Sequence, residues 1–140
     1  MCSNPNFKYE LITDCPLNNK VNGESGDYYR LIRNEAPKDE DFLPNYWKDF
    51  FQVQKSEMES KKETDKLCRS QGLSLLKCKA DAENTAKKFK KMNAKAICKG
   101  YLDNSKGVLQ KTPPDFTSHH TFYAYKDINE LSIFEIEVVL

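Results

Sequence analysis

The only two histidines of this chain are adjacent, in the segment Ser118-His119-His120-Thr121. Histidine can bind a metal ion, and it can activate a neighbouring thiol or hydroxyl as a nucleophile. Successive residues of a strand point to opposite faces, so His119 and His120 are poorly placed to hold one metal ion together. We therefore predict no metal centre. We expect one ring at the edge of the core and the other in a surface cleft, where it can contact a ligand.

The same segment disfavours two kinds of histidine-dependent enzyme. A two-histidine phosphoesterase needs two separated H-x-S/T units, and His119-x-Thr121 provides one while no histidine is left for the other. A cysteine protease needs a thiol of low pKa beside a histidine, and none of the five cysteines stands at an evident electropositive helix start. The histidines therefore predict ligand contact rather than either chemistry.

A second polar set comprises Arg30, Ser74 and a late glutamate, Glu135 or Glu137, in three separate strand-like segments. In this order the set resembles the ADP-ribosyltransferase group and its relatives. In that group an early strand arginine binds the dinucleotide, a middle strand carries a serine and a late glutamate polarises the ribose. The resemblance implies a NAD-using transferase or hydrolase with those roles at these positions. The structural alternative is that Arg30 snorkels from an edge strand and Ser74 fills a tight contact after Gly72.

The two late glutamates share one face of any regular strand, because they are two residues apart. The apolar residues that alternate with them should claim the core, and these are Phe134, Ile136 and Val138. Glu135 and Glu137 should then point to the other face of the sheet, away from Arg30. We therefore favour the structural interpretation of this set.

The densest basic cluster of the chain lies in a predicted helix and the segment after it. Its members are Lys87, Lys88, Lys90, Lys91, Lys95 and Lys99. On a helix buried through its alanines and Phe89, these lysines face outward, where Lys87, Lys88 and Lys91 can contact phosphates. Aromatic residues are not interleaved with them, so a solvated helix face is favoured over a nucleic-acid site.

The strongest local pattern covers residues 72–102. Residues 72–78 form a short apolar run opened by a glycine, residues 81–93 place apolar side chains at helical spacing, and residues 96–102 are apolar again. This change of period predicts strand, helix, strand. The side chains expected in the core are Leu73, Leu75, Ala86, Phe89 and Ile97.

The other elements follow from alternation and turn residues. Residues 1–27 form an irregular segment with an edge strand at 7–13, and residues 28–140 form the domain, with clear strands at 28–33 and 133–140. Pro44 is well placed to begin a helix through about Gln54 that turns Trp47, Phe50 and Phe51 inward. Residues 55–71 predict a solvated helix or a loop, and residues 101–109 predict a hairpin.

Five segments of the chain also resemble a set of small bacterial proteins that have no assigned activity. In that set a strand with Y-x-R is followed by E-D-F, G-L-S, a helix and a late H-x-T-x-W. The corresponding segments here are residues 28–32, 40–43, 72–75, 96–100 and 119–123. Tyr123 stands where the tryptophan is expected. The resemblance implies an intracellular bacterial fold and supplies no reaction.

Composition limits the environment of the protein. The 140 residues include 22 basic and 21 acidic side chains, for a formal net charge of +1, so no global field attracts nucleic acid or membrane. Mean hydropathy is −0.76, and the longest apolar run is too short to cross a bilayer. The N-terminus lacks the basic start and apolar stretch of a secretory signal. We expect a soluble cytoplasmic protein.

The cysteines are five in number and irregularly spaced, at positions 2, 15, 68, 78 and 98. They form no C-x-x-C pair and no zinc-site spacing. Cys78 and Cys98 lie in apolar strand patterns, where a free thiol behaves as a small hydrophobe. We therefore expect all five thiols to be reduced, as in a cytosolic protein.

These patterns predict one α+β domain with a mainly antiparallel sheet and two or three helices. The function we favour is a non-catalytic protein-interaction or accessory module that acts without a cofactor, on a protein partner the sequence does not identify. The first alternative is the NAD-using, ADP-ribosyltransferase-like enzyme. The second is weak nucleic-acid binding through the lysine-rich helix.

Overall fold

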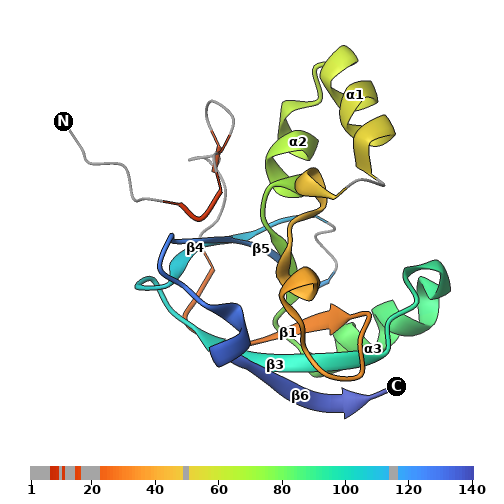
Figure 1. Ribbon diagram of the computed structural model, residues 1–140, viewed down its shortest axis with the longest axis vertical. Coiled ribbons are helices and arrows are strands. Elements are labelled where there is room, and N and C mark those ends of the chain that lie inside the picture. Colours follow the sequence, from red (N-terminus) through yellow and green to blue (C-terminus); the bar gives the residue numbers. More distant parts are fainter. Residues whose placement is uncertain (1–6, 10, 12–14, 17–22, 49–50, 114–116) are drawn as a thin grey trace.

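The computed structural model describes residues 7–9, 11, 15–16, 23–48, 51–113 and 117–140. Within them the chain forms one antiparallel sheet and three α-helices, as predicted for an α+β domain (Figure 1). The strands are β1 Gly26–Ile32, β2 Leu73–Leu76, β3 Ala96–Leu102, β4 Gly107–Lys111, β5 His119–Ala124 and β6 Phe134–Val139. The helices are α1 Gln52–Ser60, α2 Thr64–Ser70 and α3 Lys79–Lys88. Short 3-10 helices are η1 Asp39–Phe42, η2 Asn45–Trp47, η4 Lys90–Met92 and η5 Glu130–Ser132.

The sheet has the strand order β4-β5-β2-β1-β3-β6, and every neighbouring pair is antiparallel. One core cluster draws side chains from all six strands and from η1. Leu109 of β4 and Phe134 of β6 belong to that cluster although they lie on the two outermost strands. A flat sheet would hold its edge strands far apart, so this sheet must curl around its core.

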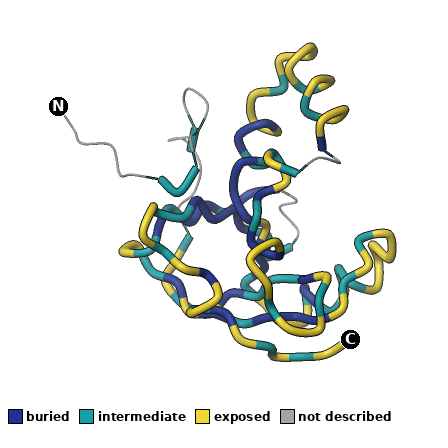
Figure 2. The backbone as a smooth tube through the Cα atoms, in the orientation of Figure 1, coloured by how far each residue is buried: buried dark blue, intermediate teal, exposed yellow. Residues whose placement is uncertain are grey.

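A smaller cluster lies on the outer face of the curled sheet. Ala82 of α3 is fully buried there against Leu76 and Ile97, with three half-buried side chains packed around them. The half-buried residues are Tyr29, Leu31 and Val138. Helix α3 therefore covers the outer face where β1, β2 and β3 meet. Helix α1 buries no residue and extends away from the sheet, as the exposed colouring shows (Figure 2).

The sheet forks between its two central strands. Strand β1 pairs with β3 along its whole length, yet it pairs with β2 only at Tyr29 and Leu76. Beyond that bridge β1 runs on to Ile32 and β2 runs back to Leu73 without pairing with each other. The guanidinium of Arg30 crosses the gap, because its Nη1 donates to the Ser74 carbonyl at 2.9 Å.

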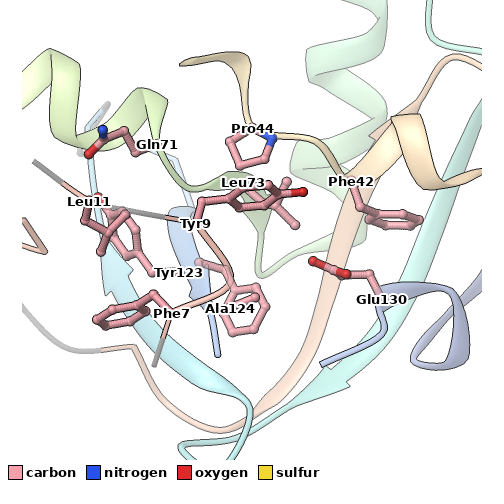
Figure 3. Close-up of a pocket in the computed structure, with 11 residues that line it drawn as sticks. Phe7, Tyr9, Leu11, Phe42, Pro44, Gln71, Leu73, Tyr123, Ala124 and Glu130 are labelled. Carbon is pink, nitrogen blue, oxygen red and sulfur yellow. The ribbon is translucent and has the colours of Figure 1, made fainter. Parts of the chain in front are cut away.

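An N-terminal anchor, residues 7–9, 11 and 15–16, packs against the sheet, and its Phe7, Tyr9 and Leu11 line a small pocket (Figure 3). Phe7 bridges to Tyr125, and the Lys8 ammonium forms an ion pair with Glu130, whose side chain is almost fully buried. Tyr9 stacks on Trp47 with ring centroids 6.0 Å apart. The pocket beneath the anchor keeps a volume of only about 10 Å³, so the anchor fills it to within the space of one water molecule.

The anchor is covalently attached, because Cys15 and Cys68 form a disulfide. The prediction that all cysteines are reduced is therefore wrong for this pair. Their sequence separation of 53 hides the pairing, which arises only when α2 brings Cys68 to the anchor. Cys78 is an exposed free thiol and Cys98 is a buried one. Cys2 lies outside the described residues.

The strand–helix–strand prediction for residues 72–102 is confirmed, although the buried face of the helix was assigned incorrectly. Leu73, Leu75 and Ile97 are buried as predicted. Ala86 is only half-buried, and the Phe89 side chain is 52% exposed. Helix α3 ends at Lys88, and Phe89 itself leaves helical geometry at φ −108° and ψ 67°. The chain therefore turns before Phe89 can reach the sheet.

Two further element predictions are wrong. The helix expected from Pro44 does not form, because η2 ends at Trp47 and α1 begins at Gln52. Trp47 is 40% exposed instead of buried, whereas Phe51 is buried and Phe50 lies outside the described residues. The hairpin expected over residues 101–109 is absent, since β4 pairs with β5 and β3 pairs with β1 and β6. Strands β1 and β6 occupy both edges of β3, so no edge of β3 remains for β4.

Core packing predicts opposite outcomes for two phenylalanines. The Phe134 side chain is 2% exposed and stacks on Phe42 with ring centroids 5.3 Å apart. Phe134→Ala should lower the free energy of unfolding by about 3–5 kcal/mol in urea denaturation. Phe89→Ala, in which the exposed ring is removed, should change it by less than about 0.5 kcal/mol. Equal losses in the two variants would contradict this packing.

The disulfide predicts a similar contrast between two cysteines. Cys15→Ser opens the loop that the disulfide closes, so it should destabilise the protein by about 2–4 kcal/mol. Cys78→Ser alters an exposed free thiol and should cost less than about 0.5 kcal/mol. Intact mass before and after reduction provides an independent check. A protein that gains no hydrogens on reduction would refute the disulfide.

Candidate functional site

A groove of about 940 Å³ opens at the fork of the sheet. Its volume falls in the range of small-molecule and peptide-side-chain pockets. The end of β1, the η1–η2 segment, the end of α2, the start of β2 and the η4 segment after α3 all contribute to it. The groove therefore exists because β1 and β2 separate after one bridge, which leaves room that a paired sheet would fill.

Positive charge dominates the lining of the groove. Among the described residues, five cationic side chains line it, together with two carboxylates and the neutral ring of His119. The cations are Arg30, Arg33, Lys48, Arg69 and Lys91. The carboxylates are Glu40 and Asp41. The two exposed aromatic rings that line the groove, Trp47 and Phe89, come from η2 and from the end of α3.

Arg30 is the best-positioned of these cations. Its Nε and Nη2 donate to the Asp41 carbonyl at 3.0 and 2.8 Å, and its Nη1 donates to the Ser74 carbonyl. Both acceptors of these three hydrogen bonds are neutral main-chain oxygens, and no carboxylate in the described part of the chain forms an ion pair with this guanidinium. Burial lowers the pKa of Arg30 to about 10, which leaves it protonated at neutral pH.

The Asp41 carboxylate is committed to the loop between β1 and η1. It accepts hydrogen bonds from the Arg33 and Lys38 main-chain N–H groups at 3.1 and 2.9 Å, and from the Asn34 amide. The same Asn34 amide donates to Glu40 at 3.0 Å. Both groove carboxylates therefore accept hydrogen bonds from their own loop, and the Asp41 side chain, at 5% exposed, is turned away from solvent.

Lys48 lies where the cations converge. Its pKa is lowered to about 8, and burial is the largest cause. The charges of Arg30 and Arg33 also lower this pKa, and Asp41 and Glu40 raise it by less. A lysine with this pKa remains mostly protonated at neutral pH, but it loses its proton within the range in which proteins stay folded.

The two histidines lie on opposite faces of β5, in accordance with strand geometry. His119 lines the groove, and its Nδ1 shares a 2.8 Å hydrogen bond with the Thr112 hydroxyl. Burial lowers its pKa to about 4, so the ring is neutral at pH 7. His120 packs edge-on against Tyr28 in the core, and its Nδ1 donates to the Ser118 carbonyl at 2.7 Å. One ring therefore lines the groove and the other packs against Tyr28.

The structure brings Arg30 and Ser74 together but leaves the late glutamates elsewhere. Glu135 is exposed opposite Lys99, and Glu137 forms an ion pair with Lys79 at 3.4 Å. A bulge at Ile97/Cys98 makes Glu137 the unpaired residue of β6, and the strand changes face there. Consequently Phe134 and Ile136 pack on the main cluster, whereas Val138 joins the cluster under α3. The expectation that all three alternating residues share one core is wrong for Val138.

Only part of the predicted lysine cluster meets the groove. Lys91 of η4 lines it, whereas Lys87 and Lys88 are exposed at the end of α3 and are not among its lining residues. Arg33, Lys48 and Arg69 were not predicted as site residues, because single cations scattered along the chain carry no local pattern. Only the fold brings them together. The exposure of Trp47 in the groove also depends on tertiary structure, because its helical spacing in the sequence predicted a buried side chain.

Comparisons with protein-family models, with curated proteins and with solved structures returned no match for this chain. In the described residues, no group of three or more histidine, cysteine, aspartate or glutamate side chains is arranged to hold a metal ion. None of the helices in that part of the chain has the length and apolar character needed to span a membrane.

The environment of His119 predicts a pH dependence of stability. Its pKa of about 4 lies below the value of about 6.5 for an unfolded chain, so the fold favours the neutral ring. This contribution is fully present above pH 6.5 and is lost as the pH falls toward 4. Unfolding free energies measured between pH 7 and 4 should decline less in His119→Gln than in the parent. A His119 NMR titration near pH 6.5 would contradict the burial of the ring.

Proposed function

We propose that this protein is a non-catalytic binding module whose groove receives an acidic segment of a protein partner. The observation that supports the proposal is the charge of the groove, whose described lining carries five cationic side chains and two carboxylates that are hydrogen-bonded within their own loop. An acidic segment would complement that excess and would be attracted to it during diffusional encounter.

The apolar part of the lining supports a polypeptide ligand. Leu31, Leu43, Pro44 and Met92 line the groove beside the cations, and Trp47 exposes 40% of its surface there. Interfaces between proteins commonly combine an aromatic anchor with surrounding polar contacts. A segment that alternates acidic and apolar side chains would therefore satisfy both kinds of lining.

The arrangement gives less support to the enzyme alternative. Arg30 and Ser74 meet in the groove, as a NAD site of the ADP-ribosyltransferase type requires, but Glu135 and Glu137 are not among its lining residues. Glu40 is available in their place, although it accepts a hydrogen bond from Asn34. The proposal therefore treats Arg30 as a residue that shapes the groove and presents charge, and NAD serves as a comparison ligand.

Nucleic acid is the second candidate, and one observation favours it. Phe89 and Trp47 expose their rings beside Lys91 and other cations of the groove. Single-stranded nucleic acids bind to such combinations through base stacking and phosphate contacts. The formal net charge of +1 argues for a confined site rather than an extended track, and a short single-stranded oligonucleotide tests this candidate directly.

The cytoplasmic and bacterial setting expected from the sequence is part of the same proposal. The Cys15–Cys68 disulfide counts against the cytoplasmic location, because disulfides persist mainly in oxidising compartments. Fractionation of cells that express the full chain, followed by mass analysis of the trapped thiols, tests both points. A disulfide recovered intact from a reducing cytosol would indicate that the anchor shields the bond.

The proposed ligand class predicts the effect of charge reversal in the groove. A short fluorescein-labelled peptide that alternates glutamate and leucine should bind, and Arg69→Glu/Lys91→Glu should weaken it by about tenfold or more. Lys87→Glu/Lys88→Glu makes the same charge change outside the groove lining and should have a much smaller effect. Fluorescence anisotropy measures both, and Trp47, the only tryptophan, reports independently.

Three outcomes would contradict the proposal. The first is equal binding of a matched peptide with glutamine in place of glutamate. The second is equal loss in the two charge-reversal variants, which would indicate a general charge effect. The third is tighter binding of NAD or of a thymine oligonucleotide than of the acidic peptide, with the same sensitivity to Arg69→Glu/Lys91→Glu.

A further inference from the structure

The direction of the main-chain groups at the fork follows from the alternation of strand residues. In an antiparallel ladder, successive residues direct their N–H and C=O groups toward opposite neighbouring strands. The Ile32 carbonyl accepts a hydrogen bond from the Lys95 N–H at 2.8 Å, so Ile32 faces the β3 side. Leu31, one residue earlier in β1, therefore directs both its N–H and its C=O toward β2.

Strand β2 directs Ser74 toward the same fork. The Lys77 N–H donates to the Ser118 carbonyl at 3.2 Å, which places Lys77 on the β5 side of the ladder. Ser74 is three residues earlier, so its main-chain groups point the opposite way, toward β1. The 2.9 Å hydrogen bond from Arg30 to the Ser74 carbonyl is in accordance with this direction.

Leu31 and Ser74 would be the next hydrogen-bonded pair if the ladder continued past the bridge of Tyr29 with Leu76. They do not pair, and Arg30 supplies a donor for the Ser74 carbonyl alone. The described residues provide no hydrogen bond to the other three groups, which are the Leu31 N–H, the Leu31 C=O and the Ser74 N–H. We call these three the open main-chain groups.

The open main-chain groups lie in the groove, because Leu31 and Ser74 both line it. Along β1 the next residue that faces the fork is Arg33, and its N–H already donates to the Asp41 carboxylate at 3.1 Å. The fold therefore satisfies the positions on both sides of Leu31, through the Tyr29 bridge and through Asp41, and leaves Leu31 itself open. Main-chain groups in such a place pair with water or with a ligand.

We propose that the acidic segment of the partner binds in the groove as an extended strand, with its main chain paired to the open main-chain groups. The proposal rests on the proposed function and specifies the conformation of its ligand. One residue of the segment exchanges two hydrogen bonds with Leu31, and its neighbour, which faces the other way, accepts one from the Ser74 N–H. A helical segment has no such groups to offer, because its own hydrogen bonds use them.

The charge of the groove selects the side chains of this strand. Arg69 and Lys91 line the groove, and neither takes part in an ion pair of the described residues. Glutamate side chains would complement them, and Trp47, 40% exposed in the same lining, provides an apolar contact. Main-chain pairing supplies affinity that does not depend on these side chains. The two contributions can therefore be changed separately.

Amide hydrogen exchange tests the pairing directly. In the free protein, the Leu31 and Ser74 amides should exchange faster than those of Ile32 and Leu75, which face the paired sides of their strands. Saturation with the glutamate–leucine peptide should slow Leu31 and Ser74 exchange by about tenfold or more relative to Ile32 and Leu75. NMR spectroscopy measures all four rates in one sample. Equal slowing of the four amides, or no slowing, would overturn the proposal.

A single substitution removes one of the open main-chain groups without disturbing the ladder. Ser74→Pro deletes an N–H that takes no part in β2–β5 pairing, whereas Ser74→Ala keeps the N–H and removes only an exposed hydroxyl. Peptide affinity, measured by anisotropy, should fall about fivefold in Ser74→Pro and less than about twofold in Ser74→Ala. Equal losses would contradict the pairing. Urea denaturation checks that both variants fold, and if Ser74→Pro does not, the exchange rates of the parent protein decide.

The outcomes separate the mode of binding from the function on which it rests. If the peptide binds with sensitivity to Arg69→Glu/Lys91→Glu but leaves Leu31 and Ser74 exchange unchanged, the strand is wrong and the binding module stands. If no peptide binds, the proposed function fails and the strand fails with it. If the same peptide held in a helix by a side-chain crosslink binds more tightly than the linear form, the extended conformation is wrong.

Discussion

The groove depends on a single arginine that replaces strand pairing. Where β1 and β2 separate, Arg30 donates to the Ser74 carbonyl on one side and twice to the Asp41 carbonyl on the other. A main-chain carbonyl that leaves a sheet ladder needs another donor, so these bonds replace hydrogen bonds that pairing of β1 with β2 would otherwise supply. The same contacts keep the charge of Arg30 free of carboxylate partners among the described residues. Structural support and the positive potential of the groove therefore have one origin.

The loop between β1 and η1 shows how the fold protects this arrangement. If the Asp41 carboxylate turned toward Arg30, it would form a buried ion pair and cancel the nearest positive charge. Instead it binds main-chain N–H groups of its own loop, and only its carbonyl contacts the arginine. A network of this kind fixes side-chain direction without neutralising charge. The electrostatics of the groove thus follow from which atom of Asp41 faces Arg30.

Local patterns in the sequence predicted the elements that local physics determines. The change of period over residues 72–102 gave β2, α3 and β3, because alternation and helical spacing are properties of neighbouring residues. The pairing of β4 with β5 and the bulge at Ile97/Cys98 were not predictable, since they depend on the curl of the whole sheet. The sequence indicated only part of the groove lining. Arg30, Ser74, His119 and Lys91 could be selected as chemistry-bearing residues, but their convergence with Lys48 and Arg69 is decided by tertiary structure.

The disulfide makes the anchor a link between two parts of the structure. Phe7 and Lys8 contact residues that follow β5, namely Tyr125 and Glu130. Cys15 is bonded to Cys68 of α2. A reducing agent would break only the second attachment and would leave the contacts of Phe7 and Lys8, the two residues before Tyr9, in place. The redox state would therefore change how α2 is connected to the anchor before it changes the stack of Tyr9 on Trp47.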